Sequence, residues 1–331
     1  MTYSSGGLIQ ATDYNGFVST TAGANINDVW GTGSGDKGWG QTALATTSAA
    51  STVTATQWAQ LVNTMSTAGT QTGTTLTARS APTAGTVINV LAAVNTDLTN
   101  ITTNRGNAVG VSAASSTWSG STAKTTATGT GGVLWSIQWT HTVTFPSADQ
   151  ARYFWNAGGL VVLDMSKTST GFDNDPDWNT FIGTIGTLYM SGRVNSADQQ
   201  INGSTWTGFT RIGGTGTPSP NLTTTGWYSL TAGAAATTMW QLNNTTSPYT
   251  GDFVRITAAK NAGATTLTFV TTWYSAGDAN PGASTNISGG TDTASGGGFG
   301  TAPAVRCRFV SPSVTYLTNS WGTPTVAAAV A

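Results

Sequence analysis

The clearest hydrophobic pattern in the chain is a strict alternation between residues 135 and 145. The apolar positions, which alternate with Ser, Gln and Thr, are Trp135, Ile137, Trp139, His141, Val143 and Phe145. A period of two predicts a β-strand with one buried face. Shorter runs of the same kind, separated by Gly, Asn and Pro turns, lie at residues 187–190, 205–212, 227–230, 238–242, 253–258, 266–273 and 304–310. Many short strands joined by turns are typical of a β-sandwich.

Helical periodicity dominates the stretch before these strands. Thr54 and Gln57 form a capping-box pattern, and the apolar residues Trp58, Leu61, Val62 and Met65 follow at helical spacing. A second apolar stripe, in steps of four and three, consists of Val87, Leu91, Val94, Leu98 and Ile101. The two stretches predict a helical hairpin. The second stripe either packs against the first helix or a sheet, or forms a coiled coil between subunits.

Two further short helices are predicted among the strands. Ser147 and Gln150 form a capping pattern that leads into an aromatic run ending at residues 158–159. Asp175 and Pro176 have the order of a cap followed by a first-turn proline, and Trp178 lies behind them. Beyond the last predicted strand, residues 326–331 form a small apolar tail.

Residues 1–53 are rich in Gly, Ser, Thr and Ala and have no sustained periodicity. We expect an extended arm here, which is either a disordered tail or a segment that packs on a neighbouring subunit. Packing is favoured, because tryptophans exposed to water would be costly. The candidate assembly residues are Trp30, Trp39, Val87, Leu91, Val94, Leu98 and Ile101. The predicted organisation is an arm (1–53), a helical hairpin with a linker (54–125) and a β-rich domain (126–331). The fold class is mainly β with short helices, and α+β overall.

The composition narrows the range of possible functions. The chain of 331 residues has no glutamate, and 12 Lys and Arg stand against 13 Asp. Without a basic excess, binding to nucleic acid or to anionic lipid is not expected. No stretch approaches 18 apolar residues and the first residues resemble no signal peptide, so we expect a protein made in a cytoplasm and not inserted into a membrane. A neutral surface favours self-association.

Few residues offer site chemistry. Asp173, Asp175 and Asp177 are the only acidic cluster and are weak candidates for a hard cation, but a helix cap explains them as well. The only histidine, His141, shares a strand face with apolar residues and is expected in a core or interface. The single cysteine, Cys307, excludes an intrachain disulfide. We expect no catalytic residues, no cofactor and no enzymatic activity.

Two other functions are open to the sequence. A glycosidase needs two carboxylates, and Asp149 with Asp164, or Asp252 with Asp278, could serve. Asp164 is expected instead to pair with an arginine such as Arg152 or Arg193. The thirteen tryptophans make sugar binding a candidate function, because an aromatic ring can stack on a sugar. Most of them, however, lie on apolar faces, where packing in the core is the default.

The segment 141–159, HTVTFPSADQARYFWNAGG, resembles a group of virion structural proteins of tailed bacteriophages, many of them marine. The resemblance extends to residues 54–58, 210–218, 222–228 and 316–324, and so covers most of the chain. It implies a virion component of the tail, fibre or tail tip that acts by homo-oligomeric assembly. Its partners would be other copies and other virion proteins, with a host surface glycan as a further candidate. A head decoration or head fibre and a carbohydrate-binding receptor module are the alternatives.

Overall fold

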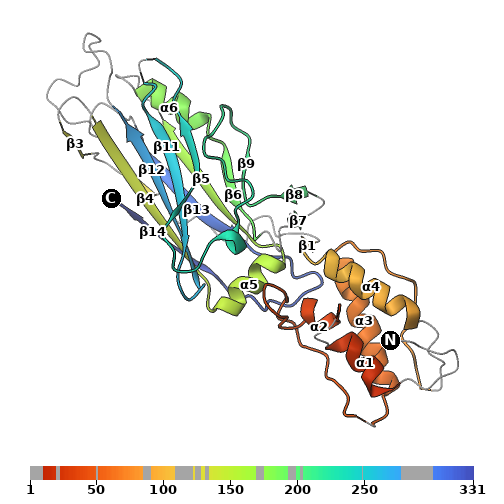
Figure 1. The fold of residues 1–331 in the computed structure, drawn as a ribbon. Helices are drawn as coiled ribbons and strands as arrows, with labels where there is room; N and C mark the ends of the chain where they lie inside the picture. The colour runs from red at the N-terminus through yellow and green to blue at the C-terminus, as the bar shows by residue number, and fades with distance from the viewer. Residues whose placement is uncertain are drawn as a thin grey trace.

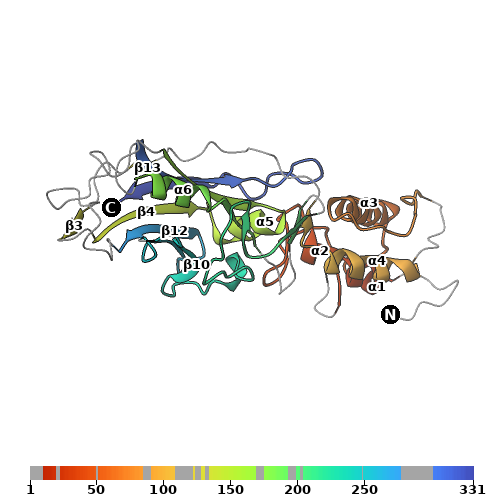
Figure 2. The ribbon, with the colours of Figure 1, turned by 90° about the horizontal axis from the view of Figure 1, so that it is seen from above.

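The computed structural model describes residues 10–19, 23–49, 51–84, 91–108, 122–123, 128–130, 134–168, 175–192, 199–201, 204–247, 249–276 and 301–331. The fold is mainly β, with two large antiparallel sheets and six short helices in the described residues (Figure 1). The expected α+β, mostly β class is confirmed. The sheets lie at one end of the molecule and α1 to α4 at the other, with α5 between them (Figure 1, Figure 2).

The helices are α1 (Ala11–Val18), α2 (Ile26–Val29), α3 (Ala55–Gln71), α4 (Leu91–Thr103), α5 (Ala148–Asn156), α6 (Asp175–Gly183) and a 3-10 turn, η1 (Trp227–Ser229). The strands are β1 (Asn107–Ala108), β2 (Thr122–Ala123), β3 (Thr128–Thr130), β4 (Leu134–Thr144), β5 (Leu160–Thr168), β6 (Thr187–Met190), β7 (Gln199–Ile201), β8 (Ser204–Trp206), β9 (Phe209–Ile212), β10 (Thr237–Asn243), β11 (Phe253–Lys260), β12 (Thr266–Ser275), β13 (Thr301–Val310) and β14 (Thr325–Val330).

The first large sheet has the order β10-β11-β12-β4-β14, with β3 paired to one end of β4. Strand β4, which lies between β12 and β14, confirms the alternation predicted from the sequence. Ile137, Trp139, His141 and Val143 are fully buried on one face of β4, and the register pairs His141 with Phe269 of β12. The apolar tail is a strand, β14, which pairs with β4 along its whole length.

The second large sheet has the order β2-β13-β5-β6-β9. Successive side chains of β5 point to opposite faces of the sheet. Val161 and Leu163 therefore belong to the main core, whereas Leu160 and Val162 belong to a separate apolar cluster. The separate cluster also contains Ala108 of β1, and Trp206 of β8 packs against it. A small sheet, β1-β7-β8, therefore covers part of the outer face of the second sheet.

The main core between the large sheets is aromatic. Trp273 lies 4.9 Å from Trp139, centroid to centroid, and stacks on Trp178 of α6 at 5.8 Å with an interplanar angle of 11°. Offset and tilted ring pairs of this kind add stabilisation beyond their buried area. Trp178 thereby fixes α6 on the sandwich.

One predicted strand is wrong. Residues 227–230 begin with the 3-10 turn η1, in which Leu230 donates its N–H to the carbonyl of Trp227. Gly226, which precedes this turn, has no room for a side chain, since a Cβ there would lie 2.5 Å from the carbonyl oxygen of Ser191. The predicted strand at 205–212 is likewise divided into β8 and β9, with Gly208 at a positive φ of 53° between them.

The segment expected to be an extended arm is folded. It contains α1 and α2, and Tyr14 and Phe17 make edge-on contacts with Trp58 of α3 at 5.7 and 6.0 Å. The helices begin at polar caps, with Asn25 accepting a hydrogen bond from the N–H of Asp28. The two aromatic side chains lie on the same side of a short helix and must be buried against another element. Helix α3 of the same chain buries them.

The candidate assembly residues are corrected in the same way. Trp39, Val94, Leu98 and Ile101 are at most 1% exposed in the core of this chain, and α4 packs against α1, α2 and α3. Trp30 is partly buried, 6.4 Å from the ring of Trp39. Val87 lies outside the described residues, as does the side chain of Leu91. The apolar stripe therefore serves helix packing within the chain, the first of the two alternatives.

Two polar clamps attach the N-terminal segment to distant parts of the fold. The side chain of Asn156 in α5 donates to the carbonyls of Asp36 and Gly38 at 2.8 and 2.9 Å. Gln41 donates to the carbonyl of Thr318 at 3.0 Å and accepts the N–H of Thr318 at 2.9 Å. One contiguous core includes residues of α1 to α4 and of both large sheets, and the domain boundary near residue 125 stays a prediction.

The capping box of α3 provides a first test. Thr54 accepts the N–H of Gln57 at 3.2 Å, and Gln57 accepts the N–H of Thr54 at 2.8 Å. Thr54→Ala is expected to lower the free energy of unfolding by about 1 kcal/mol, measured by urea denaturation. Thr56→Ala, an exposed change in the same turn, is the control and is expected to be near neutral. Equal losses in both variants would contradict the capping role.

Candidate functional site

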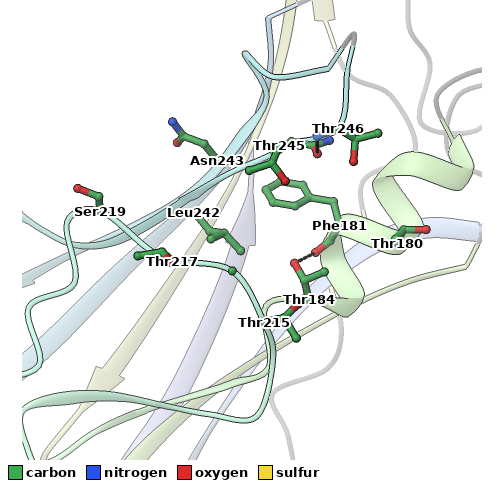
Figure 3. Close-up of a pocket in the computed structure, with 12 residues that line it drawn as sticks. Thr180, Phe181, Thr184, Thr215, Thr217, Ser219, Leu242, Asn243, Thr245 and Thr246 are labelled. Carbon is green, nitrogen blue, oxygen red and sulfur yellow. Dashed lines mark hydrogen bonds between the residues drawn. The ribbon is translucent and has the colours of Figure 1, made fainter.

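A polar recess lies where α6, the loop 213–219 and the end of β10 meet (Figure 3). Its volume is about 420 Å³. The lining residues are Thr180, Phe181, Thr184, Thr215, Gly216, Thr217, Ser219, Leu242, Asn243, Asn244, Thr245 and Thr246. The lining contains no charged side chain and has hydroxyl or amide groups at nine of these twelve positions.

Helix α6 places the aromatic floor of the recess. Trp178 is anchored in the core, and Phe181 follows three residues later on the same side of the helix. The ring of Phe181 lies against the recess together with Leu242 of β10, whereas Thr180 and Thr184 lie at the rim (Figure 3). Phe181 is 5% exposed, so little of its ring is open to a ligand.

The loop wall depends on glycine. Gly214 has φ of 74°, and a Cβ there would lie 2.4 Å from the carbonyl oxygen of Thr184. The guanidinium of Arg211 donates to the carbonyls of Thr215 and Gly216, both at 2.9 Å. The N–H of Thr215 donates to the carbonyl of Thr184 at 2.7 Å. The loop is therefore held to β9 and to the end of α6, and the charge of Arg211 is directed at backbone oxygens.

The opposite wall is a polar turn after β10. The side chain of Asn244 donates to Asp177 of α6, and its oxygen accepts the N–H of Thr246 at 2.9 Å. Burial raises the pKa of Asp177, and hydrogen bonds from Asn244 and Thr246 oppose that rise. Asp177 thus links α6 to this turn through its hydrogen bond with Asn244, and it does not itself line the recess.

The arrangement presents donors and acceptors without formal charge. It fits a neutral ligand with several hydroxyl groups better than a phosphate, a carboxylate or a metal ion. The lining contains no acid, base or activated nucleophile, so it offers no means of general acid–base catalysis.

The aspartate cluster is not assembled into a cation site in the part of the fold that is described. Asp173 lies outside the described residues, as does the side chain of Asp175, and Asp177 binds Asn244. Within the described ranges, no group of three His, Cys or Asp side chains converges. The helix predicted from Asp175 and Pro176 is present as α6.

His141 and Cys307 are both inside the sandwich. Burial lowers the pKa of His141 to about 4, and the backbone carbonyl of Val305 on the facing sheet opposes that change. Burial raises the pKa of the Cys307 thiol, which is inaccessible. The prediction that His141 is a packed residue is confirmed.

The carboxylates considered for glycosidase chemistry have other partners. Asp164 binds Arg306 of β13 and not Arg152, which binds Asp149 at 2.8 Å; Arg193 lies outside the described residues. The β5/β13 register, which pairs these two residues directly, explains the correction. Asp252 accepts the hydroxyl of Ser275 at 3.1 Å and the N–H of Ala276 at 2.9 Å. Asp278 lies outside the described residues.

The tryptophans do not form an exposed stacking platform in the described residues. Those that are almost fully buried are Trp39, Trp58, Trp139, Trp155, Trp178, Trp240, Trp273 and Trp321. The large hydrophobic residues that are exposed there are Ile212, Val314 and Tyr316. Sugar binding through tryptophan is therefore not supported in this part of the chain, and the recess is the better candidate for a ligand site.

The sequence pointed to only one part of the recess. The glycines at 213–216 indicate a turn, but the polar residues opposite them are common throughout the chain and carry no special pattern. No helix in the described ranges combines the length and the apolar character needed to cross a membrane. In comparisons with known proteins, no family model matches the chain, and no curated protein or solved structure is significantly similar to it.

Proposed function

We propose that the protein is a structural component of a tailed-phage virion, in the tail, fibre or tail tip, and that it acts by homo-oligomeric assembly. It would be made in the host cytoplasm and reside in the particle, with other copies and other virion proteins as partners. The resemblance of residues 141–159 and four further segments supports this assignment. The proposal gives the chain no enzymatic activity.

The observation that carries the proposal is how little charge the chain has, with 12 Lys and Arg against 13 Asp in 331 residues. Ion pairs within the chain join Lys37 to Asp28, Arg79 to Asp97, Arg152 to Asp149 and Arg306 to Asp164. These pairs neutralise four of the 12 basic and four of the 13 acidic residues. Copies of such a protein repel one another weakly, and their contacts would depend little on salt.

The test is to find the protein in particles. Mass spectrometry of particles purified from the phage that encodes the chain is expected to detect it in many copies per virion. Immunogold labelling should then place it on the tail, whereas labelling on the capsid would favour the alternative of a head decoration or head fibre. Absence from purified particles would overturn the proposal.

The recess supports a second candidate function, binding of a neutral host glycan. Its hydroxyl and amide lining beside Phe181 suits the alternating polar and apolar faces of a sugar. Host attachment through a particle surface protein would use such a site. This candidate is compatible with the structural role.

Removing two lining hydroxyls tests glycan binding. Thr217→Val with Thr245→Val, both at exposed lining positions, is expected to weaken binding to an array-selected glycan about thirtyfold, because each of the two lost hydrogen bonds contributes about 1 kcal/mol. Thr237→Val, at an exposed position outside the lining, is the matched control. An array on which the wild-type protein binds no glycan would end this candidate.

A further inference from the structure

Strand β14 is the edge of the first large sheet, beside β4 (Figure 1). The register runs from Thr325 opposite Thr144 to Val330 opposite Trp139, and Ala331 exchanges hydrogen bonds with Gln138 at 2.8 and 3.1 Å. Backbone groups alternate in direction along an antiparallel strand. Residues 325, 327, 329 and 331 therefore direct their N–H and C=O toward β4, and Val326, Ala328 and Val330 direct theirs away from it.

The outward row of β14 has no hydrogen-bond partner among the described residues. The strand also lacks the features that usually block an edge, since it contains no charged residue and no proline, and its register with β4 is unbroken. Thr325, Ala327 and Ala329 are exposed on the outer face, whereas Val326 and Val330 pack against the core. An uncharged edge of small side chains is a template for another strand.

The sequence of β14 indicates that the strand that pairs with its free edge is β14 of a second copy. Residues 326–330 read Val-Ala-Ala-Ala-Val in both directions, with Ala328 at the centre. In an antiparallel pair of two copies with a two-fold axis at Ala328, Val326 lies opposite Val330 of the second copy, and Ala327 lies opposite Ala329. All outward groups are then used, because three residues in each copy contribute one N–H and one C=O apiece.

We propose that β14 is a dimerisation strand, which joins the first sheets of two copies into one continuous antiparallel sheet through the pairing centred on Ala328. This deepens the proposed function by naming one contact between copies, and it rests on that function for its biological setting. Valine meets valine on the inner face and alanine meets alanine on the outer face, so no side chain obstructs the pairing.

The register can be tested with charge pairs at the exposed positions. Sedimentation velocity of the full chain over a dilution series is expected to show a monomer–dimer equilibrium. Ala327→Lys with Ala329→Lys places two like-charge pairs across the axis and is expected to weaken dimerisation about tenfold. Ala327→Lys with Ala329→Asp creates two opposite-charge pairs and is expected to restore it. Ala235→Lys with Ala236→Lys, on an exposed loop, is the matched control and should leave the dimer unchanged.

A backbone variant tests the hydrogen bonds. Ala328→Pro removes an outward N–H that the β4 pairing does not use, and is expected to abolish the dimer while thermal unfolding remains cooperative. If it fails to fold, the charge variants on the exposed face still decide the result. A wild-type chain that stays monomeric at every concentration, or a dimer equally strong in both charge variants, overturns the proposal.

The two proposals fail in different ways. A monomeric chain that is nevertheless found in purified particles overturns β14 dimerisation and leaves the virion role standing. A dimer that follows the predicted charge pattern, in a protein absent from particles, overturns the virion role alone. Pairing of β14 with a strand of another virion protein would appear as a monomer in solution, and so counts against self-pairing.

Discussion

Replacing Arg79 with methionine is expected to lower the free energy of unfolding by about 3 to 5 kcal/mol. Arg79 forms an ion pair with Asp97 of α4, and the two side chains are only 5% and 3% exposed. Asp97 also accepts the N–H of Thr77 at 3.1 Å. Without the guanidinium, a buried carboxylate keeps one backbone donor and loses its countercharge. Urea denaturation at neutral pH measures the loss.

Two controls separate burial from charge. Lys37→Met breaks the ion pair with Asp28, in which both side chains are more exposed, and is expected to cost less than 1 kcal/mol. Arg79→Met combined with Asp97→Leu removes both charges, and is expected to recover part of the loss. A single Arg79→Met variant as stable as Lys37→Met would contradict the account of the buried pair.

Acidification is expected to destabilise the protein through His141. Its pKa is about 4 in the folded chain and 6.5 in an ordinary setting, so the unfolded chain binds the proton first as the pH falls. The stability contributed by the neutral ring is present above pH 6.5 and is lost as the pH falls toward 4. The full difference corresponds to about 3 kcal/mol. Urea midpoints measured from pH 7 to pH 4 follow the loss.

The variant His141→Phe isolates this effect, because His141 is the only histidine in the chain. The variant is expected to lack the part of the pH dependence that lies between 6.5 and 4. Asp177, whose pKa is raised, titrates in both proteins and cancels in the difference. Parallel curves for the two proteins over this range would refute the role of His141.

Local pattern was sufficient for many individual elements. The alternation around Trp139 predicted β4, and capping residues with helical spacing predicted α3, α5 and α6. These signals lie within a few residues of one another in the sequence. The arm prediction failed because α1 and α2 are too short to show sustained periodicity, and their stability comes from contact with Trp58.

The candidate site depends on long-range geometry. The recess brings together residues near 180, 215 and 245, and each contributes threonines that look like any others in a Thr-rich sequence. Pairing between strands likewise decided the partner of Asp164, since only the β5/β13 register places Arg306 beside it. The chemistry of individual side chains could be predicted from the sequence. Which three segments come together to line the recess could not.

The clamp at Gln41 has a kinetic consequence. Gln41 and Thr318 are 277 positions apart, and their hydrogen bonds close one of the longest loops that the chain can make. Contacts between such distant residues form late, because the entropy of loop closure is lost before the contact stabilises anything. The N-terminal segment is therefore expected to dock only after residues 318–320 have folded. The edge strand β14, which follows them, is expected to be among the last parts to become ordered.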